Sequence, residues 1–218
     1  MRHLPVFLDV ADRPCLVVGG GAVAARKAEA LLRAGARVTL VAPLVGPEVE
    51  SLARADGRLT LHRRPYEVAD MAGCWLAYAA TDDPAVQERV ARDAERERVW
   101  LNAVDEPERC SFVMPAILER GRVTVAVGTG GASPLLAAAI RDEMALHVGP
   151  EHAAAADELA ALRARFAPGA ARRAAFASML AAGLLEALRR GDAARVAEIT
   201  REACAELEAR ADGPAGLP

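Results

Sequence analysis

The first half of the chain alternates between short apolar runs and longer segments that carry an apolar stripe. Residues 15–18, Cys-Leu-Val-Val, form a continuous apolar run that is typical of a strand buried on both faces. A helix is expected over residues 22–34, because apolar residues recur there at helical spacing and Gly35 follows at the position favoured after a helix. The same alternation predicts strands over 37–41, 59–63, 75–80 and 99–102, and helices over 47–55 and 84–98. Such short connections between strands and helices predict a doubly wound, Rossmann-like α/β fold with a parallel sheet.

The pattern changes after residue 110. Strands are expected over residues 111–115 and 122–127, separated by residues 116–121, and a glycine-rich turn then leads into a helix that begins near Ser133. From about Gly149 the chain is rich in Ala, Arg and Leu, and its apolar residues recur at helical spacing without strand signals. We therefore predict three parts: a Rossmann domain over 1–111, a small α+β region over 112–148, and a helical domain over 149–218 with a frayed end at 212–218.

The composition is that of an ordinary folded protein. Hydrophobic residues make up 53% of the chain, charged residues 26%, and the formal net charge is −3. These values argue against a disordered chain and against a nucleic-acid-binding protein that relies on bulk positive charge. The chain has no apolar run of about 18 residues and no signal-peptide pattern, so we expect a cytoplasmic protein without a membrane span. Cysteines without CxxC spacing indicate reduced, mostly buried thiols; they are Cys15, Cys74, Cys110 and Cys204.

A glycine-rich turn follows the first predicted strand. Its pattern is G-x-G-x-x-A over Gly19, Gly21 and Ala24, between a strand and a helix, as in dinucleotide-binding proteins. Gly19 permits the tight turn, Gly21 lets the backbone approach a pyrophosphate, and Ala24 lets the helix pack on the sheet. The alternative is a glycine-rich turn that binds nothing. The second strand ends without the acidic residue that usually binds the adenosine ribose, so these residues do not decide between NAD and NADP.

Two polar residues follow the fourth predicted strand. Thr81 and Asp82 lie at its carboxyl end, where ligands bind in this architecture. Either side chain could contact the ribose or the nicotinamide of a cofactor. The alternative, which we favour as the larger role, is that Thr81 or Asp82 caps the helix that begins at Pro84.

Two more polar residues leave the fifth predicted strand at the same rim of the sheet. We assign Asn102 to the cofactor site, and Asp105 to the chemistry. A dehydrogenase needs a group that accepts a proton as a hydride departs, and a carboxylate near the nicotinamide can do this. The alternative for Asp105 is a structural turn residue before Pro107.

A second glycine-rich turn spans residues 128–132. Ser133 can cap the helix that follows it, and Pro134 suits the first turn of that helix. Gly130 and Gly131 would let a carboxylate of a ligand approach main-chain N–H groups. A carboxylate-rich substrate could use this turn, while the alternative is a tight connection between strand and helix.

Several segments together resemble the precorrin-2 dehydrogenase/sirohydrochlorin ferrochelatase family, which includes the N-terminal half of siroheme synthase. The matching stretches are LPVFLDVADRPCLVVGGGAVAARKAEALLRAGARVTLVAP, CWLAYAATDDPAVQERVA, LNAVDEPERCSFVMPAILERG and VAVGTGGASPLLAAAIRDEM. They occur in the family's order and cover residues 4 to about 148. This combination is far more specific than any one glycine pattern.

The resemblance implies an activity. Members of this family use NAD to oxidise precorrin-2 to sirohydrochlorin, and many then insert ferrous iron to make siroheme, a step that the residues of this chain leave open. The principal catalytic residue matches Asp105. Residues that line the NAD site match Ala22 and Val23 after the glycines, and Pro43 and Leu44 after the second strand.

The resemblance also implies a substrate site and an assembly. The serine near the tetrapyrrole matches Ser133, next to Gly130 and Gly131. Family members are homodimers in which the region around residues 112–148 is intertwined between subunits. The chain beyond about residue 150 matches only loosely, so the resemblance assigns no role to it.

Two other classes of function compete with this interpretation. A regulatory Rossmann module that senses NAD would explain the first glycine turn but would leave Asp105 and the second turn without a purpose. An ordinary NAD(P) dehydrogenase of small alcohols usually carries a Tyr-x-x-x-Lys pair, which neither Tyr66 nor Tyr78 forms. The histidines are scattered and no His/Cys cluster has metal-ligand spacing, so we expect no resident metal.

Overall fold

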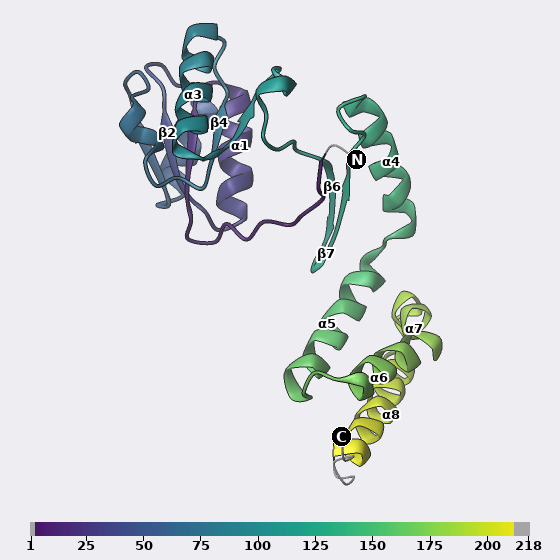
Figure 1. Cartoon of the computed structure of the whole chain (residues 1–218). Coiled ribbons are helices and arrows are strands. Elements are labelled where there is room, and N and C mark those ends of the chain that lie inside the picture. Colours follow the sequence, from purple (N-terminus) through teal and green to yellow (C-terminus); the bar gives the residue numbers. More distant parts are fainter. Residues whose placement is uncertain (1–2, 212–218) are drawn as a thin grey trace. The chain divides into compact units, whose positions relative to one another are not determined.

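The computed structural model describes residues 3–211, so the predicted frayed end at 212–218 lies outside the described residues. The chain divides into two compact units, one up to Met114 and the other from Pro115 onward. Figure 1 shows the α/β unit in purple to teal and the second unit in teal-green to yellow. Each unit is described by itself below.

The first unit is built on a five-stranded parallel sheet in the order β3-β2-β1-β4-β5. The strands are β1 (Pro14–Val18), β2 (Arg37–Val41), β3 (Leu59–His62), β4 (Leu76–Ala79) and β5 (Trp100–Ala103). The helices are α1 (Ala22–Arg33), α2 (Pro47–Ala55) and α3 (Pro84–Glu97), with short 3-10 helices η1 (Val68–Met71) and η2 (Pro107–Arg109). The predicted doubly wound α/β fold is confirmed, and the bounds of its predicted strands and helices agree with the observed ones to within one residue.

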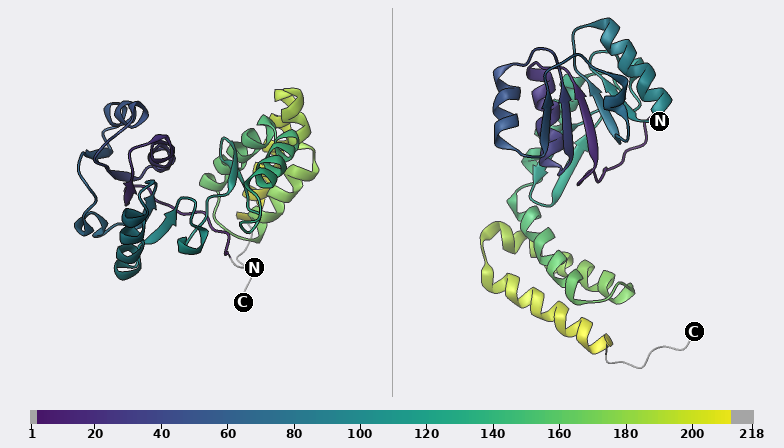
Figure 2. Two further views of the ribbon diagram at one scale, coloured as in Figure 1. Left: turned by 90° about the horizontal axis from the view of Figure 1, so that it is seen from above. Right: turned by 90° about the vertical axis from the view of Figure 1, so that its left-hand side faces the viewer.

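The sheet separates two apolar clusters, because successive side chains of each strand point to opposite faces. Val17 of β1 and Leu40 of β2 pack with α1 and α2 on one face. Leu16 of β1 and Ala77 of β4 pack with α3 on the other. The right-hand view of Figure 2 shows helices on both faces of the sheet. This double cover explains why β1 reads as an unbroken apolar run.

The second unit begins with an antiparallel hairpin and continues in helices. Its strands are β6 (Ala116–Arg120) and β7 (Val123–Val127), which pair from Ala116 opposite Val127 to Arg120 opposite Val123. Its helices are α4 (Pro134–His147), α5 (Pro150–Arg165), α6 (Ala170–Ala181), α7 (Leu184–Arg190) and α8 (Ala193–Ala211). The last four share an apolar core that includes Leu162, Met179, Leu184 and Ile199. The prediction of a helical C-terminal region is confirmed.

The predicted strand over 111–115 is wrong, and residues 116–121, expected to separate two strands, contain the whole of β6. Ser111 is bound to β5 instead: its hydroxyl accepts a hydrogen bond from the Leu101 N–H at 2.6 Å, and its own N–H donates to the Leu101 carbonyl at 2.8 Å. β6 gains its partner through a two-residue turn, in which Gly121 has a φ of 55°. The tight turn at Gly121, and not the hydrophobicity of residues 111–115, therefore determines which residues form the strand that pairs with β7.

Two further properties of the described residues complete the fold. All four cysteines are free thiols; Cys15 is buried, while Cys74, Cys110 and Cys204 are only partly so, which corrects the expectation that most are buried. Among residues 3–211, no helix has both the length and the apolar character needed to cross a bilayer.

Candidate functional site

The first glycine turn is shaped by its neighbours. Gly19 has a φ of 134°, and a Cβ there would lie 2.0 Å from the Ala80 carbonyl oxygen. A Cβ on Gly20 would lie 1.9 Å from the Leu44 carbonyl oxygen. At Gly21, by contrast, a Cβ would meet no described atom within 4 Å, so this backbone faces open space. The predicted roles of Gly19 in a tight turn and of Gly21 at an approachable surface agree with this geometry.

Sequence reasoning missed Gly20, the middle residue of the pattern. Its backbone passes directly beneath the loop that follows β2, and the Gly20 carbonyl accepts a hydrogen bond from the Gly46 N–H at 2.8 Å. Pro43 and Leu44 are exposed in that loop. The three consecutive glycines were the only signal in the sequence, and they do not tell which glycine meets which neighbour.

The N-terminus of α1 opens directly from this turn. Gly21 occupies the N-cap position and supplies no side-chain hydrogen bond to the first N–H groups. Those groups and the helix dipole favour a bound anion such as a pyrophosphate. Ala24 is fully buried against the sheet, as the small residue of the pattern predicts.

The rim after β4 differs from the prediction in one respect. The cap of α3 is Asp83, whose carboxylate accepts hydrogen bonds from the N–H groups of Ala85 and Val86, and not Thr81 or Asp82. The helix starts at Pro84, and the residue immediately before it is the one placed to cap. Thr81 instead supports the cap, because its hydroxyl accepts a hydrogen bond from the Asp83 N–H at 3.3 Å. Asp82 is left with its side chain at the rim.

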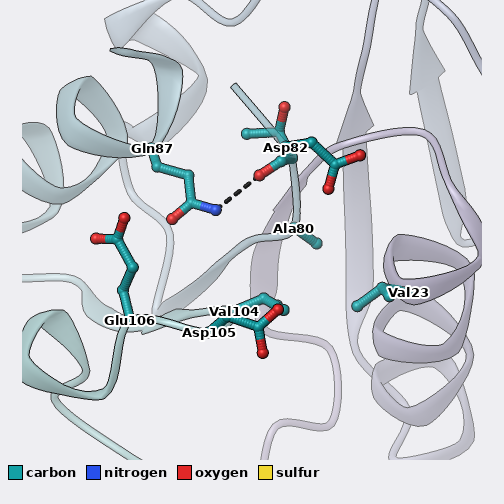
Figure 3. A pocket seen from close by; sticks show the side chains of 8 residues that line it. Val23, Ala80, Asp82, Gln87, Val104, Asp105 and Glu106 are labelled. Atoms are coloured by element: carbon teal, nitrogen blue, oxygen red, sulfur yellow. Dashed lines mark hydrogen bonds between the residues drawn. The ribbon is translucent and has the colours of Figure 1, made fainter. Parts of the chain in front are cut away.

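A pocket of about 340 Å³ lies at this rim, beside the start of α1. Its lining residues are Val23, Ala80, Thr81, Asp82, Gln87, Val104, Asp105 and Glu106. Figure 3 shows these side chains arranged around the opening, with Val23 of α1 on one side and Gln87 of α3 on another. The structure thus brings together Val23, Thr81, Asp82 and Asp105 from segments up to 82 positions apart in the sequence.

Asp105 has an unusual backbone. Its φ is 61°, in the left-handed region that few residues other than glycine adopt, although Asp and Asn tolerate it best. Its side chain is exposed at the pocket. A residue held in such a conformation is typical of functional sites, where the surrounding structure imposes the strain.

Cys110 stabilises the turn that carries Asp105 through contacts with the backbone on either side of that residue. The Cys110 thiol accepts a hydrogen bond from the Ala103 N–H at 3.3 Å, and it lies 3.2 Å from the Ala103 carbonyl and 3.4 Å from the Glu106 carbonyl. Burial raises the pKa of the Cys110 thiol, so the sulfur keeps the proton with which it can bind these carbonyls. This role could not be predicted from the sequence, because the contact depends on how the chain returns after η2.

Asn102 is placed differently from Asp105. Its side chain is 9% exposed, and its amide nitrogen donates to the Phe112 carbonyl at 3.0 Å and to the Cys110 sulfur at 3.6 Å. Asn102 does not line the pocket. Its side chain secures the segment after η2 against β5, and its assignment to the cofactor stays a prediction.

The pocket also contains two polar residues that the sequence did not single out. Gln87 lies on α3, is 8% exposed, and donates from its amide nitrogen to the Thr81 carbonyl at 2.7 Å. Glu106 follows Asp105 and forms an ion pair with Arg109, with 2.5 Å between Oε2 and Nε. Gln87 carries no local signal, because its position in the first turn of α3 is that of an ordinary helical residue.

The second glycine turn belongs to the second unit. Gly130 and Gly131 have φ values of 65° and 88°, and a Cβ on either would meet no described atom within 4 Å. The Ser133 hydroxyl caps α4 by accepting a hydrogen bond from the Leu136 N–H at 3.1 Å, so the predicted cap is confirmed. Thr129 closes the turn, since its hydroxyl donates to the Ser133 carbonyl at 3.0 Å and accepts from the Ser133 N–H at 3.1 Å.

No group of three or more His, Cys, Asp or Glu side chains in the described part of the chain is arranged to hold a metal ion. The pocket carboxylates of Asp82, Asp105 and Glu106 therefore do not amount to a metal site by their geometry. The arrangement is suited to an organic ligand that spans an anion-binding helix end and a rim rich in hydrogen-bond acceptors.

Comparison with known proteins agrees with this geometry. A family model for NAD(P)-binding proteins matches residues 6–116, which is more than half of the chain. The chain belongs to this family. The matched residues include the glycine turn, the rim after β4 and the segment of Asp105.

Two siroheme synthases and one solved structure extend the comparison. A siroheme synthase from Citrobacter koseri is 41% identical over 211 residues, which are 94% of this chain and 46% of the relative. A siroheme synthase from Escherichia coli O1:K1 / APEC is 47% identical over 153 residues, or 68% of this chain and 33% of the relative. The chain thus spans half or less of the length of these curated relatives. Among solved structures, SirC, a precorrin-2 dehydrogenase, matches with a TM-score of 0.72 at 26% identity, over 94% of this chain and 99% of that one.

Proposed function

We propose that this chain is an NAD-dependent dehydrogenase that oxidises precorrin-2 to sirohydrochlorin, a step of siroheme biosynthesis. The observation that carries the proposal is the pocket, which is lined both by Asp105 and by Val23 at the start of α1. The named relatives, two siroheme synthases and a precorrin-2 dehydrogenase, supply the substrate.

The residues present fit a dinucleotide. The open backbone at Gly21 and the uncapped start of α1 would receive the pyrophosphate. Pro43 and Leu44, exposed beside the glycine turn, would cover the adenosine half, because that half lies over the second strand of such sheets. The nicotinamide half would then lie toward β4 and β5, over the pocket of Asp82 and Asp105.

The reaction removes one hydride and one proton from the tetrapyrrole. NAD bound at this site would supply the acceptor for the hydride. In the proposed mechanism Asp105, or a water that it orients, accepts the proton through its carboxylate, and solvent receives that proton afterwards. The left-handed backbone at Asp105 and the hydrogen bonds of Cys110 hold the carboxylate at the rim during this step.

The substrate is a polycarboxylate, and the second glycine turn offers it main-chain N–H groups. Gly130 and Gly131 leave open space around their backbone, which lets a carboxylate approach. The Ser133 hydroxyl already caps α4, so in this proposal Ser133 contributes chiefly by shaping the turn and the helix start.

We also propose a homodimer. The β6–β7 hairpin is two-stranded, and among β6, β7 and α4 only Leu118 and Ala137 are buried within the described chain. Leu135 and Leu146 of α4 are 84% and 83% exposed. An isolated hairpin with an apolar helix is marginal in water, so a second copy that covers it would supply the missing burial. Light scattering of the purified protein should give twice the monomer mass.

The deciding experiment is an anaerobic assay with enzymatically generated precorrin-2 and NAD, followed by ferrous iron. NADH formation with a sirohydrochlorin spectrum supports the proposal. NAD binding without NADH formation would favour a sensor instead. Iron insertion is a separate question, and a siroheme spectrum that develops faster than in an enzyme-free control would establish it.

The matched variants are Asp105→Asn and Asp82→Asn, which remove the same charge from the same rim. Asn tolerates the left-handed backbone of residue 105, so the fold should persist. We expect Asp105→Asn to lower kcat by roughly 10²- to 10⁴-fold at unchanged NAD affinity, as loss of a general base does. Asp82→Asn should act mainly on the KM for NAD. Near-normal turnover of Asp105→Asn would remove Asp105 from the chemistry.

A further inference from the structure

Gln87 lines the pocket, and only the nitrogen of its side-chain amide is hydrogen-bonded within the described chain. The amide nitrogen donates to the Thr81 carbonyl at 2.7 Å, and this contact fixes which end of the amide is nitrogen, because a carbonyl only accepts. The other end, Oε1, is buried and has no hydrogen-bond partner among residues 3–211. The whole residue is 8% exposed. A buried acceptor without a donor is costly to a fold, and a bound ligand or an ordered water removes this cost by supplying the donor.

No side chain that lines the pocket donates a hydrogen bond to this oxygen in the structure. Figure 3 shows the Gln87 amide oxygen on the side that faces the Glu106 carboxylate. That carboxylate is ion-paired with Arg109, and an ionised carboxylate only accepts hydrogen bonds. The remaining polar side chains that line the pocket are Thr81, Asp82 and Asp105, and none of them is hydrogen-bonded to Oε1 of Gln87.

A ligand that satisfies Gln87 therefore carries a hydrogen-bond donor, either N–H or O–H. A primary amide has two on one nitrogen, so it could give one to Gln87 and turn the other toward Glu106. The nicotinamide ring of NAD bears one primary carboxamide, and the sheet topology directs this half of a dinucleotide toward the ends of β4 and β5.

We infer that Gln87 is a positioning residue that accepts a hydrogen bond from the nicotinamide carboxamide through its buried Oε1, and so fixes which face of the ring is presented to the substrate. The inference rests on the proposed function, because it takes NAD as the cofactor. Gln87 acts on the orientation of the ring and takes no part in proton transfer.

The test compares NAD with its 3-acetylpyridine analogue, in which a methyl group replaces the amino group of the carboxamide. Dissociation constants are measured by calorimetry without substrate, so the readout is independent of turnover. The wild-type protein should bind the analogue roughly tenfold more weakly than NAD, as expected when a buried acceptor loses its donor. Gln87→Met keeps the length of the side chain but has no acceptor oxygen, and its two dissociation constants should agree within about twofold.

Asp83→Ala is the control for damage to the start of α3. It removes the helix cap but leaves Gln87 in place, so the ratio between the two cofactors should remain that of the wild type. If Gln87→Met fails to fold, the wild-type ratio still decides, because a ratio near one overturns the inference without any variant. Equal discrimination in wild type and Gln87→Met also overturns it.

The outcomes separate this inference from the proposed function. A wild-type protein that binds NAD and oxidises precorrin-2 but does not distinguish the analogue would overturn the role of Gln87 alone. A wild-type protein that binds neither cofactor would overturn both. A third readout tests the orientation itself: with NAD deuterated at C4 of the nicotinamide, the wild type should add the substrate hydride to one ring face, and Gln87→Met should add it less selectively to that face.

Discussion

The two glycine-rich turns look alike in sequence and differ in what makes glycine necessary. In the turn at residues 19–21, glycine is required because backbone carbonyls of Ala80 and Leu44 occupy the space of a Cβ at Gly19 and Gly20. In the turn at 128–131, the space around Gly130 and Gly131 is open, and glycine is favoured by the left-handed backbone alone. The first turn is packed into its unit, whereas the second is a local conformation that the chain adopts before α4.

This difference predicts where substitutions are felt. A side chain added to the packed turn must displace the backbone of another segment, which disturbs the carboxyl-terminal rim of the sheet and the proposed cofactor site together. A side chain added to the open turn strains only its own residue. Gly21 is the informative exception, since it belongs to the first turn but has open space and a φ of −86°.

The largest effect is expected for Gly20→Ala. Its Cβ would lie 1.9 Å from the Leu44 carbonyl oxygen, so the loop after β2 has to move. We expect a loss of about 2–3 kcal/mol in the free energy of unfolding, in the range of overpacked sites. NAD affinity should fall with it. Chemical denaturation and calorimetry measure the two quantities, and a stable variant with normal affinity would refute the packing argument.

Gly21→Ala should affect binding and leave stability nearly unchanged. Its Cβ meets no described atom, and its φ is available to alanine, so the free energy of unfolding should change by less than about 0.5 kcal/mol. If the pyrophosphate approaches this backbone, the added methyl group should weaken NAD binding by roughly tenfold or more. Unchanged affinity would show that the phosphates lie elsewhere.

Ser133 in the second turn allows the cap to be separated from the ligand. Ser133→Ala removes the hydrogen bond to the Leu136 N–H and should cost about 1 kcal/mol in unfolding free energy. Ser133→Asp keeps a cap but adds negative charge beside the proposed carboxylate site. Its stability should match wild type while the KM for precorrin-2 rises, and an unchanged KM would argue against a substrate carboxylate at this turn.

The smallest effect is expected for Asp70→Asn, which serves as a reference for a change in stability of the first unit away from the pocket. Asp70 is bound by Arg64 and by the Glu67 N–H. Burial opposes ionisation of Asp70, but these hydrogen bonds outweigh it and lower the pKa of the carboxyl below its usual value. The stabilisation is therefore present above about pH 4, the pKa of an unfolded Asp, and is lost as pH falls through the lowered pKa of the folded state.

Asp70→Asn should accordingly lower the unfolding temperature near neutral pH, and the difference from wild type should shrink at about pH 3. NAD affinity should stay normal, because Asp70 does not line the pocket. A difference in unfolding temperature that is independent of pH would mean that the ionised pair is not responsible. Weakened NAD binding would show that general destabilisation, and not the glycine turn, explains Gly20→Ala.

The fold of the first unit was predictable because its signals are local and repeated. The apolar run of β1 and the glycines that follow it have one common arrangement, and the alternation of strand and helix fixes a parallel sheet. The error after residue 110 arose where no such repetition exists. Residues 111–115 are as apolar as a strand, and only the hydrogen bonds of Ser111 to Leu101 show that they serve β5 instead.

The sequence by itself determined the fold class of the first unit, the turn that begins α1, the cap at Ser133 and the carboxylate at Asp105. These depend on contacts within a few residues, or on the rule that parallel strands end at one edge. Only the tertiary structure decided that Asp83 caps α3, that Cys110 supports the turn of Asp105, and that Gln87 holds a buried amide oxygen without a hydrogen-bond partner among the described residues. The physical reason is that the role of a buried polar atom depends on its hydrogen-bond partners. Those partners come from segments that the chain brings together only when it folds.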